Sequence, residues 1–220
     1  MKLSNGKLAA LIIALVIVID QAVKIWVKTH FYYGEQVDVT SWFKILFIEN
    51  NGMAFGMELG SKLLLTLFRI VASGALIYYL WRLRKRYDIP KGYIACIALI
   101  TAGALGNVID CIFYGMVFNN PVPPQVAQFL PPEGGYATIF NGRVVDMLYF
   151  PLCEWNWPQW IPGIGGDHFI FFQPIFNVAD ASLSVSVIVL ILFYAGYLAS
   201  ATSSTDKEEE IEDESDSLSE

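Results

Sequence analysis

The segment PIFNVADASLSVSVIVLILFYAGYLAS, residues 174–200, decides the fold class. An apolar run that can cross a membrane begins at about Leu183, and Asn177 and Asp180 stand just before it. About 20 apolar residues span a hydrocarbon core roughly 30 Å thick. A carboxylate at membrane depth is costly unless it is paired or hydrated. Asp180 therefore needs either a structural or a chemical reason for its position.

The rest of the chain shows the same apolar pattern. Hydrophobic residues make up 55% of the sequence and the mean hydropathy is +0.48, which favours a membrane-embedded domain. Four candidate spans cover about residues 8–28, 61–81, 92–114 and 176–199. We expect an all-α membrane protein with four transmembrane helices, occupying residues 1–200, plus a small extracytoplasmic β-containing segment and a long outer loop.

The first span resembles a signal peptide, because Lys2 and Lys7 precede its apolar core. That core runs directly into Asp20, Gln21 and Lys24 without a small-residue cleavage pattern. We therefore expect a helix that is retained in the protein.

The distribution of basic residues predicts the orientation. The link between the second and third spans, RLRKRYDIPK at 82–91, is strongly basic, whereas the segment between the third and fourth spans carries only Arg143. By the positive-inside rule, both termini and the basic link face the cytoplasm. Segments 29–60 and 115–175 then face outward. The acidic tail, 201–220, is expected to be disordered in the cytoplasm.

The two outward segments differ in composition. Residues 35–57 contain aromatic and β-branched stretches that predict a sheet-like region. The later segment is rich in Pro, Gly and Trp, for example CEWNWPQWIPGIGGDHF at 153–169, and we expect loops there. Its Trp residues suit a membrane–water boundary.

The predicted topology gathers polar residues near the outer leaflet, because each span places its polar residues at its outer end. The residues are Asp20, Lys24, Asn107, Asp110, Asp146, Asn177 and Asp180. Asp20 and Lys24 are four residues apart and can pair on one helix face. Arg69 can snorkel or neutralise a carboxylate.

Asp146 and Asp180 admit two interpretations. Two carboxyls brought close together share a proton, so one can act as a general base on water while the other acts as a general acid. Alternatively, either aspartate is a helix cap, with Asp180 satisfying free amides of the last span. The residues alone leave both readings open.

Other chemistries find little support. His30 and His168 belong to no H-E-x-x-H motif, no G-x-S-x-G occurs, and the three cysteines lack metal-site spacing. The small residues of GALGN at 103–107 suit close helix packing rather than phosphate binding. We expect no metal, no cofactor and no nucleic-acid partner.

Five ordered motifs resemble those of the lipoprotein signal peptidases (signal peptidase II), which are bacterial membrane aspartic proteases. They are DQAVK at 20–24, NNGMAFG at 50–56, GNVID at 106–110, GRVVDM at 142–147 and FNVAD at 176–180. Each motif is weak alone, but five in order on four spans are specific. The resemblance covers about residues 8–200.

The resemblance assigns roles to individual residues. It implies that Asp146 and Asp180 are catalytic and that Asn51, Gly52, Asn107 and Asn177 line the substrate site. It further implies that Asp20 and Asp110 support the site, and we place Lys24 and Arg143 with them.

The resemblance also implies an activity and a location. The substrate is a prolipoprotein carrying diacylglycerol on a cysteine, cut immediately before that cysteine at the outer face of a bacterial inner membrane. Membrane lipids and a globomycin-type inhibitor are implied partners, and we expect a monomer. A small carrier that uses the same buried charges, or a non-enzymatic membrane chaperone, is the alternative.

Two departures from the family pattern stand out. Cys111 follows the GNVID aspartate where the family usually has Arg, so Arg69 or Arg143 is a candidate substitute. The link from Asp110 to Asp146 is longer than is usual in the family, with residues 116–141 forming an apparent insertion and extra sequence near 153–173.

Overall fold

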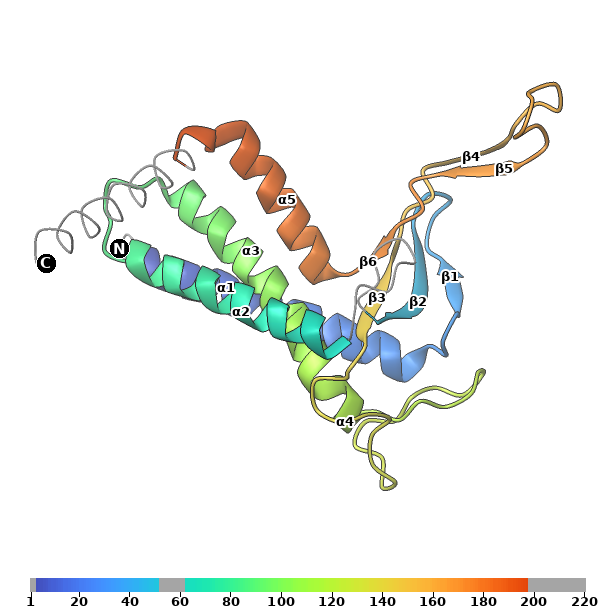
Figure 1. Ribbon diagram of the computed structural model, residues 1–220, viewed down its shortest axis with the longest axis horizontal. Helices are drawn as coiled ribbons and strands as arrows, with labels where there is room; N and C mark the ends of the chain where they lie inside the picture. The colour runs from blue at the N-terminus through green and yellow to red at the C-terminus, as the bar shows by residue number, and fades with distance from the viewer. Residues whose placement is uncertain (1–2, 52–61, 198–220) are drawn as a thin grey trace, which may run out of the picture.

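The computed structural model describes residues 3–51 and 62–197 (Figure 1). Its helical elements are α1 (Asn5–His30), α2 (Lys62–Leu83), α3 (Lys91–Ile109), the π-helical η1 (Asp110–Tyr114), α4 (Gly115–Val117) and α5 (Val178–Phe193). Its strands are β1 (Gln36–Asp38), β2 (Lys44–Asn50), β3 (Val144–Tyr149), β4 (Cys153–Asn156), β5 (His168–Phe171) and β6 (Ile175–Phe176). Gly52 and the tail 201–220 lie outside the described residues.

Three of the described helices are long and apolar enough to cross a membrane. They are α1, α2 and the continuous stretch Lys91–Val117, which is made of α3, η1 and α4. These agree with the first three predicted spans. The fourth predicted span corresponds to α5, an apolar helix of only 16 residues, shorter than the usual span.

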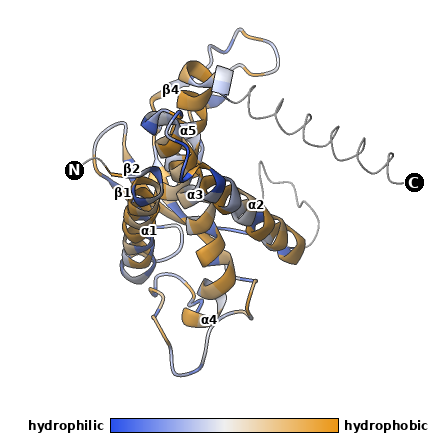
Figure 2. Cartoon of the chain, turned by 90° about the vertical axis from the view of Figure 1, so that its left-hand side faces the viewer, coloured by the Kyte–Doolittle hydropathy of each residue, from blue (hydrophilic) through white to orange (hydrophobic). Residues whose placement is uncertain are grey.

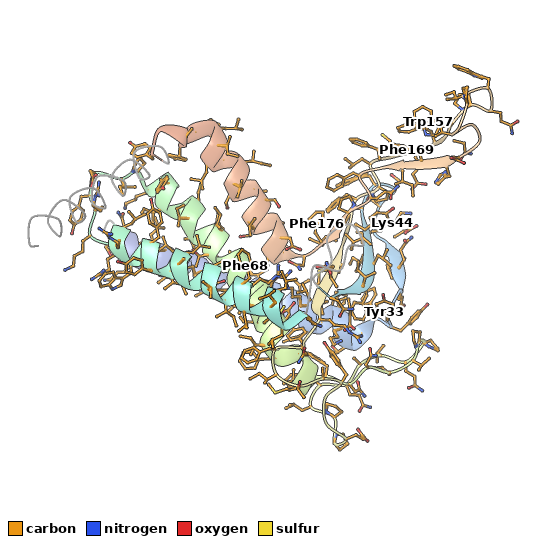
Figure 3. The ribbon with its side chains drawn as sticks, viewed as in Figure 1. Tyr33, Lys44, Phe68, Trp157, Phe169 and Phe176 are labelled. Atoms are coloured by element: carbon orange, nitrogen blue, oxygen red, sulfur yellow. The ribbon has the colours of Figure 1, made fainter. Side chains whose placement is uncertain are left out.

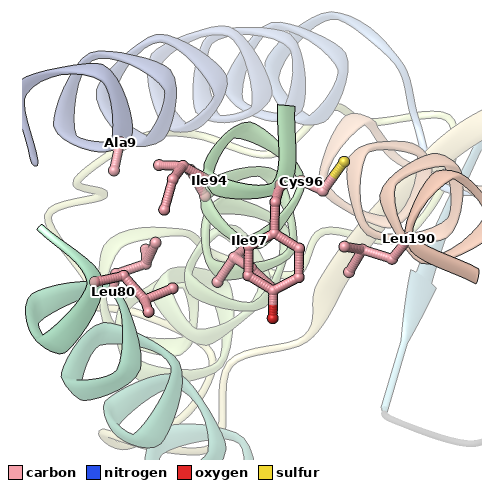
Figure 4. Packing of buried hydrophobic residues seen from close by; sticks show 9 residues of the cluster. Ala9, Leu80, Ile94, Cys96, Ile97 and Leu190 are labelled. Atoms are coloured by element: carbon pink, nitrogen blue, oxygen red, sulfur yellow. The ribbon is translucent and has the colours of Figure 1, made fainter. Parts of the chain in front are cut away.

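The helix α3 is the centre of the helical layer, because it packs against α1, α2 and α5. The contacts are made by small and branched side chains such as Ala98 and Ile97, both buried. Figure 4 shows this cluster, to which α1 contributes Ala9, α2 contributes Leu80 and α5 contributes Leu190. Between helices in lipid, such close packing rather than the hydrophobic effect supplies the stability.

A four-stranded antiparallel sheet, ordered β1-β2-β3-β6, lies at one end of the helices (Figure 1). The sheet-like expectation for 35–57 is confirmed by β1 and β2 over the residues described. Strand β3 pairs Asp146 with Ile48 of β2, and its other side pairs with β6. Strand β6 is followed almost directly by α5, so its pairing with β3 places the start of α5 near the strand that carries Asp146.

The expectation of loops over 153–169 was wrong at both ends of the segment. β4 and β5 form a two-stranded hairpin, pairing Trp155 with Phe169 and Asn156 with His168. Aromatic and β-branched residues favour strands, and the Pro and Gly residues that suggested loops are confined to the turn between the strands.

The apparent insertion at 116–141 packs back onto the body of the protein. Phe118 is fully buried beside Tyr114 and pairs through an isolated bridge with Phe129. The same cluster contains Val27 of α1 and Val145 of β3. The insertion therefore covers the sheet end of α1.

Candidate active site

The two predicted catalytic aspartates come from different layers of the fold. Asp146 lies in the middle of β3 and is only 2% exposed. Asp180 lies in the first turn of α5 and is half-buried. The sequence did not predict strand β3, although its run of Val144, Val145 and Met147 has the apolar character of a buried strand.

The side chain and backbone of Asn177 connect the two aspartates. The Asn177 Nδ2 donates to Asp146 Oδ1 at 2.7 Å, and the Asn177 backbone amide donates to Asp180 Oδ2 at 3.3 Å. The Asn177 Oδ1 accepts from the backbone amide of Asp180 at 2.9 Å, which completes a capping box at the start of α5. The N-cap residue is thus Asn177, so the interpretation of Asp180 as the cap itself was wrong. Asp180 is the other member of the capping box, and its carboxyl accepts from the same Asn177 that donates to Asp146.

Asn107 extends this network to the helices. Its Nδ2 donates to Asp180 Oδ1 at 2.7 Å, and its Oδ1 accepts from Asn177 Nδ2 at 3.1 Å. The same Oδ1 accepts from Lys24 Nζ at 2.9 Å. A chain of hydrogen bonds thus links the ammonium of Lys24 to the carboxylate of Asp180 through one amide.

Lys24 is also the centre of a buried ion cluster. Its Nζ lies 2.9 Å from Asp20 Oδ2 and 2.8 Å from Asp110 Oδ2, and none of the three side chains is exposed. The predicted Asp20–Lys24 pair is confirmed, with Asp110 as a second partner. Gln21 Nε2 donates to both carboxylates. The cluster is stable only as a unit, since an unpaired charge at this depth would be costly.

The two carboxylates of this cluster each hold one of the elements that carry a dyad aspartate. Asp20 Oδ1 accepts from the backbone amide of Ala179 at 2.9 Å, one residue before Asp180. Asp110 Oδ2 accepts from the backbone amide of Val145 at 3.2 Å, one residue before Asp146. Each bond fixes the backbone next to one of the two aspartates, and a supporting role of Asp20 and Asp110 in the site stays a prediction.

Small residues of α3 allow this close approach. A Cβ at Gly106 would lie 2.8 Å from Asp20 Oδ2 and 3.0 Å from the Cβ of Ala179. Gly103 likewise faces the backbone of Ala179. The prediction that GALGN serves helix packing is confirmed by these contacts.

The surroundings of Asp146 favour its protonated form. Burial, and after it the neighbouring charge of Asp180, raise the pKa of Asp146 to about 7. The hydrogen bond from Asn177 opposes this rise only in part. Asp146 therefore keeps its proton to a higher pH than an ordinary carboxyl does. The carboxyl of Asp180 accepts from two N–H donors.

Two predicted site residues lie outside this network. Asn51 is exposed and its Oδ1 accepts from Lys62 Nζ at 3.2 Å. Arg143 donates from Nη1 to Glu49 Oε2 at 2.9 Å, and Glu49 also pairs with Lys28. Arg143 thus belongs to a second ion cluster, at the border between the sheet and the insertion.

Arg69 is the cation that the structure places at Cys111. Its Nη1 donates to Cys111 Sγ at 3.2 Å across the α2–η1 contact. Of the two substitutes considered for the family Arg, Arg69 from the neighbouring helix occupies the position beside Cys111.

Sequence reasoning assigned no role to Gln21, which contacts Asp20, Asp110 and the carbonyl of Gly106, and accepts from the hydroxyl of Tyr114. A glutamine next to Asp20 inside an apolar helix was the available signal. Glu49 and Lys28 were also missed, because their pairing depends on the fold of β2 against α1. Among the residues described, no group of three or more His, Cys, Asp or Glu side chains could hold a metal ion.

Comparisons with known proteins agree with this site. The family model described as "Signal peptidase (SPase) II" matches residues 12–195. The chain is 50% identical over 193 residues to a lipoprotein signal peptidase of Porphyromonas gingivalis, covering 88% of this chain and 85% of the relative. It is 36% identical over 184 residues to a lipoprotein signal peptidase of Amoebophilus asiaticus, covering 81% and 73% of the two chains.

Two solved structures of a bacterial membrane enzyme are also similar. Both are 26% identical to this chain and superimpose with a TM-score of 0.56. One comparison covers 89% of this chain and 90% of the other, and the second covers 85% and 93%.

Proposed function

Because the chain belongs to the signal peptidase II family, we propose that Asp146 and Asp180 are the aspartates with which it cleaves its substrates. The family consists of membrane aspartic proteases that remove signal peptides from prolipoproteins, and this chain is such a protease. The observation that carries the residue assignment is the bridge through Asn177, which hydrogen-bonds to both carboxyls.

The different environments of the two carboxyls give each a role. Asp180, the more accessible one, takes a proton from a water molecule as the water attacks the carbonyl carbon of the scissile bond. Asp146, which is protonated below its raised pKa of about 7, donates its proton to the leaving nitrogen as the C–N bond breaks. The products are a carboxylic acid on the signal peptide and an amine on the cysteine, and the acid then ionises in water. Transfer of a proton from Asp180 back to Asp146 restores the pair.

Asn107 and Asn177 have a second role in this scheme, which is to position the carboxyls and to contact the peptide. Both amides lie beside the dyad. Asn51 and Gly52, which follow β2 in the sequence, complete the substrate site in this scheme, as the resemblance implies. Asp20 and Asp110 hold the start of α5 and strand β3 through the amides of Ala179 and Val145. Lys24 pairs with both of these carboxylates. Arg143 supports the sheet through Glu49.

The membrane position follows from the arrangement of charges and elements. The basic link between α2 and α3 lies at the end of the helices opposite the sheet (Figure 1). With that link in the cytoplasm of a bacterial inner membrane, four spans place both termini inside and the dyad at the outer face. A diacylglyceryl-modified precursor keeps its lipid tails in the bilayer there, while the bond before the lipidated cysteine reaches the dyad. A globomycin-type inhibitor would compete for this site, and one chain contains every residue that the scheme requires.

The decisive experiment compares single substitutions in full-length protein reconstituted in lipid. Asp146→Asn and Asp180→Asn should each abolish cleavage of a lipidated precursor while leaving the protein inserted and folded. Asp38→Asn, at an exposed carboxylate of β1, is the matched control and should retain activity. Retained turnover in either dyad variant would refute the assignment, and equal cleavage of an unlipidated precursor would refute the substrate class.

A further inference from the structure

The hairpin of β4 and β5 has two chemically different faces. Residues directly opposite each other in an antiparallel pair share a face, and neighbours along a strand point to opposite faces. Cys153 and Phe171 are opposite, as are Trp155 and Phe169, so these four residues share one face. The other face carries the pairs Glu154–Ile170 and Asn156–His168.

The aromatic face forms a continuous cluster. The rings of Trp155 and Phe169 lie 4.5 Å apart, and the ring of Trp157 lies 5.5 Å from Trp155 and 5.9 Å from Phe169. Trp155 nevertheless remains 39% exposed and Phe171 52% exposed. An exposed aromatic cluster of this kind marks an interaction surface.

The polar side chains on the other face of the hairpin contact one another. His168 Nδ1 lies 2.9 Å from Asn156 Oδ1, and His168 Nε2 lies 3.5 Å from Glu154 Oε2. The turn between the strands, residues 157–167, carries a charged residue only at Asp167, next to β5, and Trp160 near its tip is 80% exposed. The hairpin thus presents an aromatic face and an uncharged tip on one side and polar groups on the other.

The hairpin starts at the sheet end of the helices and projects to one side of them. In Figure 1 it leaves the sheet transverse to the helix axes, on the side of α5. Figure 2, viewed from the end of the molecule that bears the N-terminus, shows it projecting beyond α5. In Figure 3, Trp157 and Phe169 lie together on the side of the hairpin toward α5. The helix α5 exposes apolar residues such as Val185, Ile188 and Leu192, which suit contact with lipid tails.

From this placement we propose that the hairpin is an arm that rests on the bilayer surface next to α5, with its aromatic face in the lipid headgroup region. Aromatic rings with one polar atom are favoured at this boundary. A polar opposite face suits water, as in other amphipathic elements that lie in the interface. The continuity of the hairpin with α5 through β6 fixes its height at the membrane boundary. The arm goes beyond the hydrolytic site and does not depend on which residues perform the reaction.

The native cysteines offer a direct test. Cys153 is exposed on the aromatic face, whereas Cys96 and Cys111 are buried. A nitroxide label on Cys153 therefore reports on the aromatic face without altering it. The matched variant Cys153→Ser/Glu154→Cys carries the label one residue further, on the polar face. Cys153→Ser alone, treated with the same reagent, measures any labelling of the buried thiols.

The full-length protein is reconstituted in vesicles of phosphatidylethanolamine and phosphatidylglycerol. Collisions of each label with molecular oxygen, which enters lipid, are compared with collisions with a water-soluble nickel chelate. The arm predicts an oxygen-to-nickel ratio several-fold higher at position 153 than at position 154, and likewise high for Cys153→Ser/Trp160→Cys. Equal, water-like ratios at all three positions would overturn the proposal. Shielding of position 153 from both reagents would also overturn it, because that result indicates contact with protein.

Discussion

Asp20 accepts a hydrogen bond of 2.9 Å from the backbone amide of Ala179, a residue 159 positions later in the chain. The bond ties the C-terminal half of α1 to the start of α5, immediately before Asp180. Its counterpart is the bond from the Val145 amide to Asp110, which holds β3 immediately before Asp146. Because Lys24 pairs with both carboxylates, one buried cluster sets the relative position of the two dyad aspartates.

Replacing Asn177 should separate its role in the dyad from its role as a helix cap. Asn177→Ser keeps an oxygen that can cap α5 but removes the Nδ2 donor to Asp146. We expect kcat to fall about 100-fold or more in Asn177→Ser, comparable with losing one preorganised donor. Asn177→Ala should show the same kinetic loss together with about 1 kcal/mol lower stability, because the cap is lost. Kinetics on a lipidated precursor and thermal unfolding measure the two effects. A wild-type kcat in Asn177→Ser would show that the hydrogen bond from Asn177 Nδ2 to Asp146 is not needed for the reaction.

The proton on Asp146 predicts how activity depends on pH. Its pKa is raised to about 7, so the carboxyl is protonated below that value and loses its proton above it. If Asp146 donates to the leaving nitrogen, kcat should decline as the pH rises through about 7. A pH profile of kcat in a lipid-reconstituted assay tests this. A rate that increases steadily from pH 6 to pH 9 would reverse the two roles.

The same group has a consequence for stability. The folded protein binds a proton at Asp146 between the ordinary carboxyl pKa of 3.8 and about 7, whereas the unfolded chain does not. The free energy of unfolding should therefore fall as the pH rises across this interval. Asp146→Asn removes that dependence, so the variant should gain stability over the wild type at pH 8 and show little gain at pH 4. Thermal unfolding at both pH values provides the measurement.

Lys24→Met should be strongly destabilising, because it leaves Asp20 and Asp110 buried without their common cation. Removing one partner of a buried ion cluster costs about 3–5 kcal/mol. Lys24→Met/Asp110→Asn should recover part of that loss, since only one carboxylate then remains. Lys44→Met is the surface control: its pair with Asp38 is long and partly exposed, and the change should stay within about 0.5 kcal/mol. Equal effects of the two lysine substitutions would show that the cluster is not buried in the membrane protein.

Gly106→Ala should damage activity through a single added methyl group. The new Cβ would press on Asp20 and on Ala179, the two partners of the bond that holds the start of α5. We expect a loss of about 1–3 kcal/mol in stability. A displacement of Asp180 by a fraction of an ångström should reduce kcat at least tenfold, since misplacement by about 1 Å can cost 100-fold.

Gly74→Ala provides the matched control for this substitution. Gly74 lies within α2, where an added Cβ meets no atom within 4 Å, so alanine should be neutral or stabilising. A normal kcat in Gly106→Ala would show that α1, α3 and α5 can accommodate the added methyl group, and that their contact does not position Asp180.

The sequence predicted the helical layer well because the membrane imposes a simple rule on it. Long apolar runs must form helices in lipid, and three of the four expected spans appear as helices of spanning length among the described residues. The pair of Asp20 and Lys24 was also predictable, since the spacing of four residues places both on one helix face. These features depend on residues that are neighbours along the chain.

The outer region was harder to predict because its contacts join distant segments. Val144–Tyr149 and the hairpin 153–171 were not recognised as strands, since strand pairing depends on partners supplied by β2, β6 and β5. The contact of Arg69 with Cys111 depends on how α2 packs against η1. Arg143 was expected at the site but found its charge partner in Glu49, which the β2–β3 register brings opposite Val145.

By itself the sequence determined a membrane protein with its acidic and amide residues gathered at one end of the helices, because hydropathy and charge act locally along the chain. Only the tertiary structure decided which of these groups meet. It placed Asp146 in a buried strand, Asp180 in a helix cap and Asn177 between them. Burial and the neighbouring carboxylate then set the protonation of Asp146. Those two effects depend on distances between atoms that are remote in the chain, and so they exist only in the folded protein.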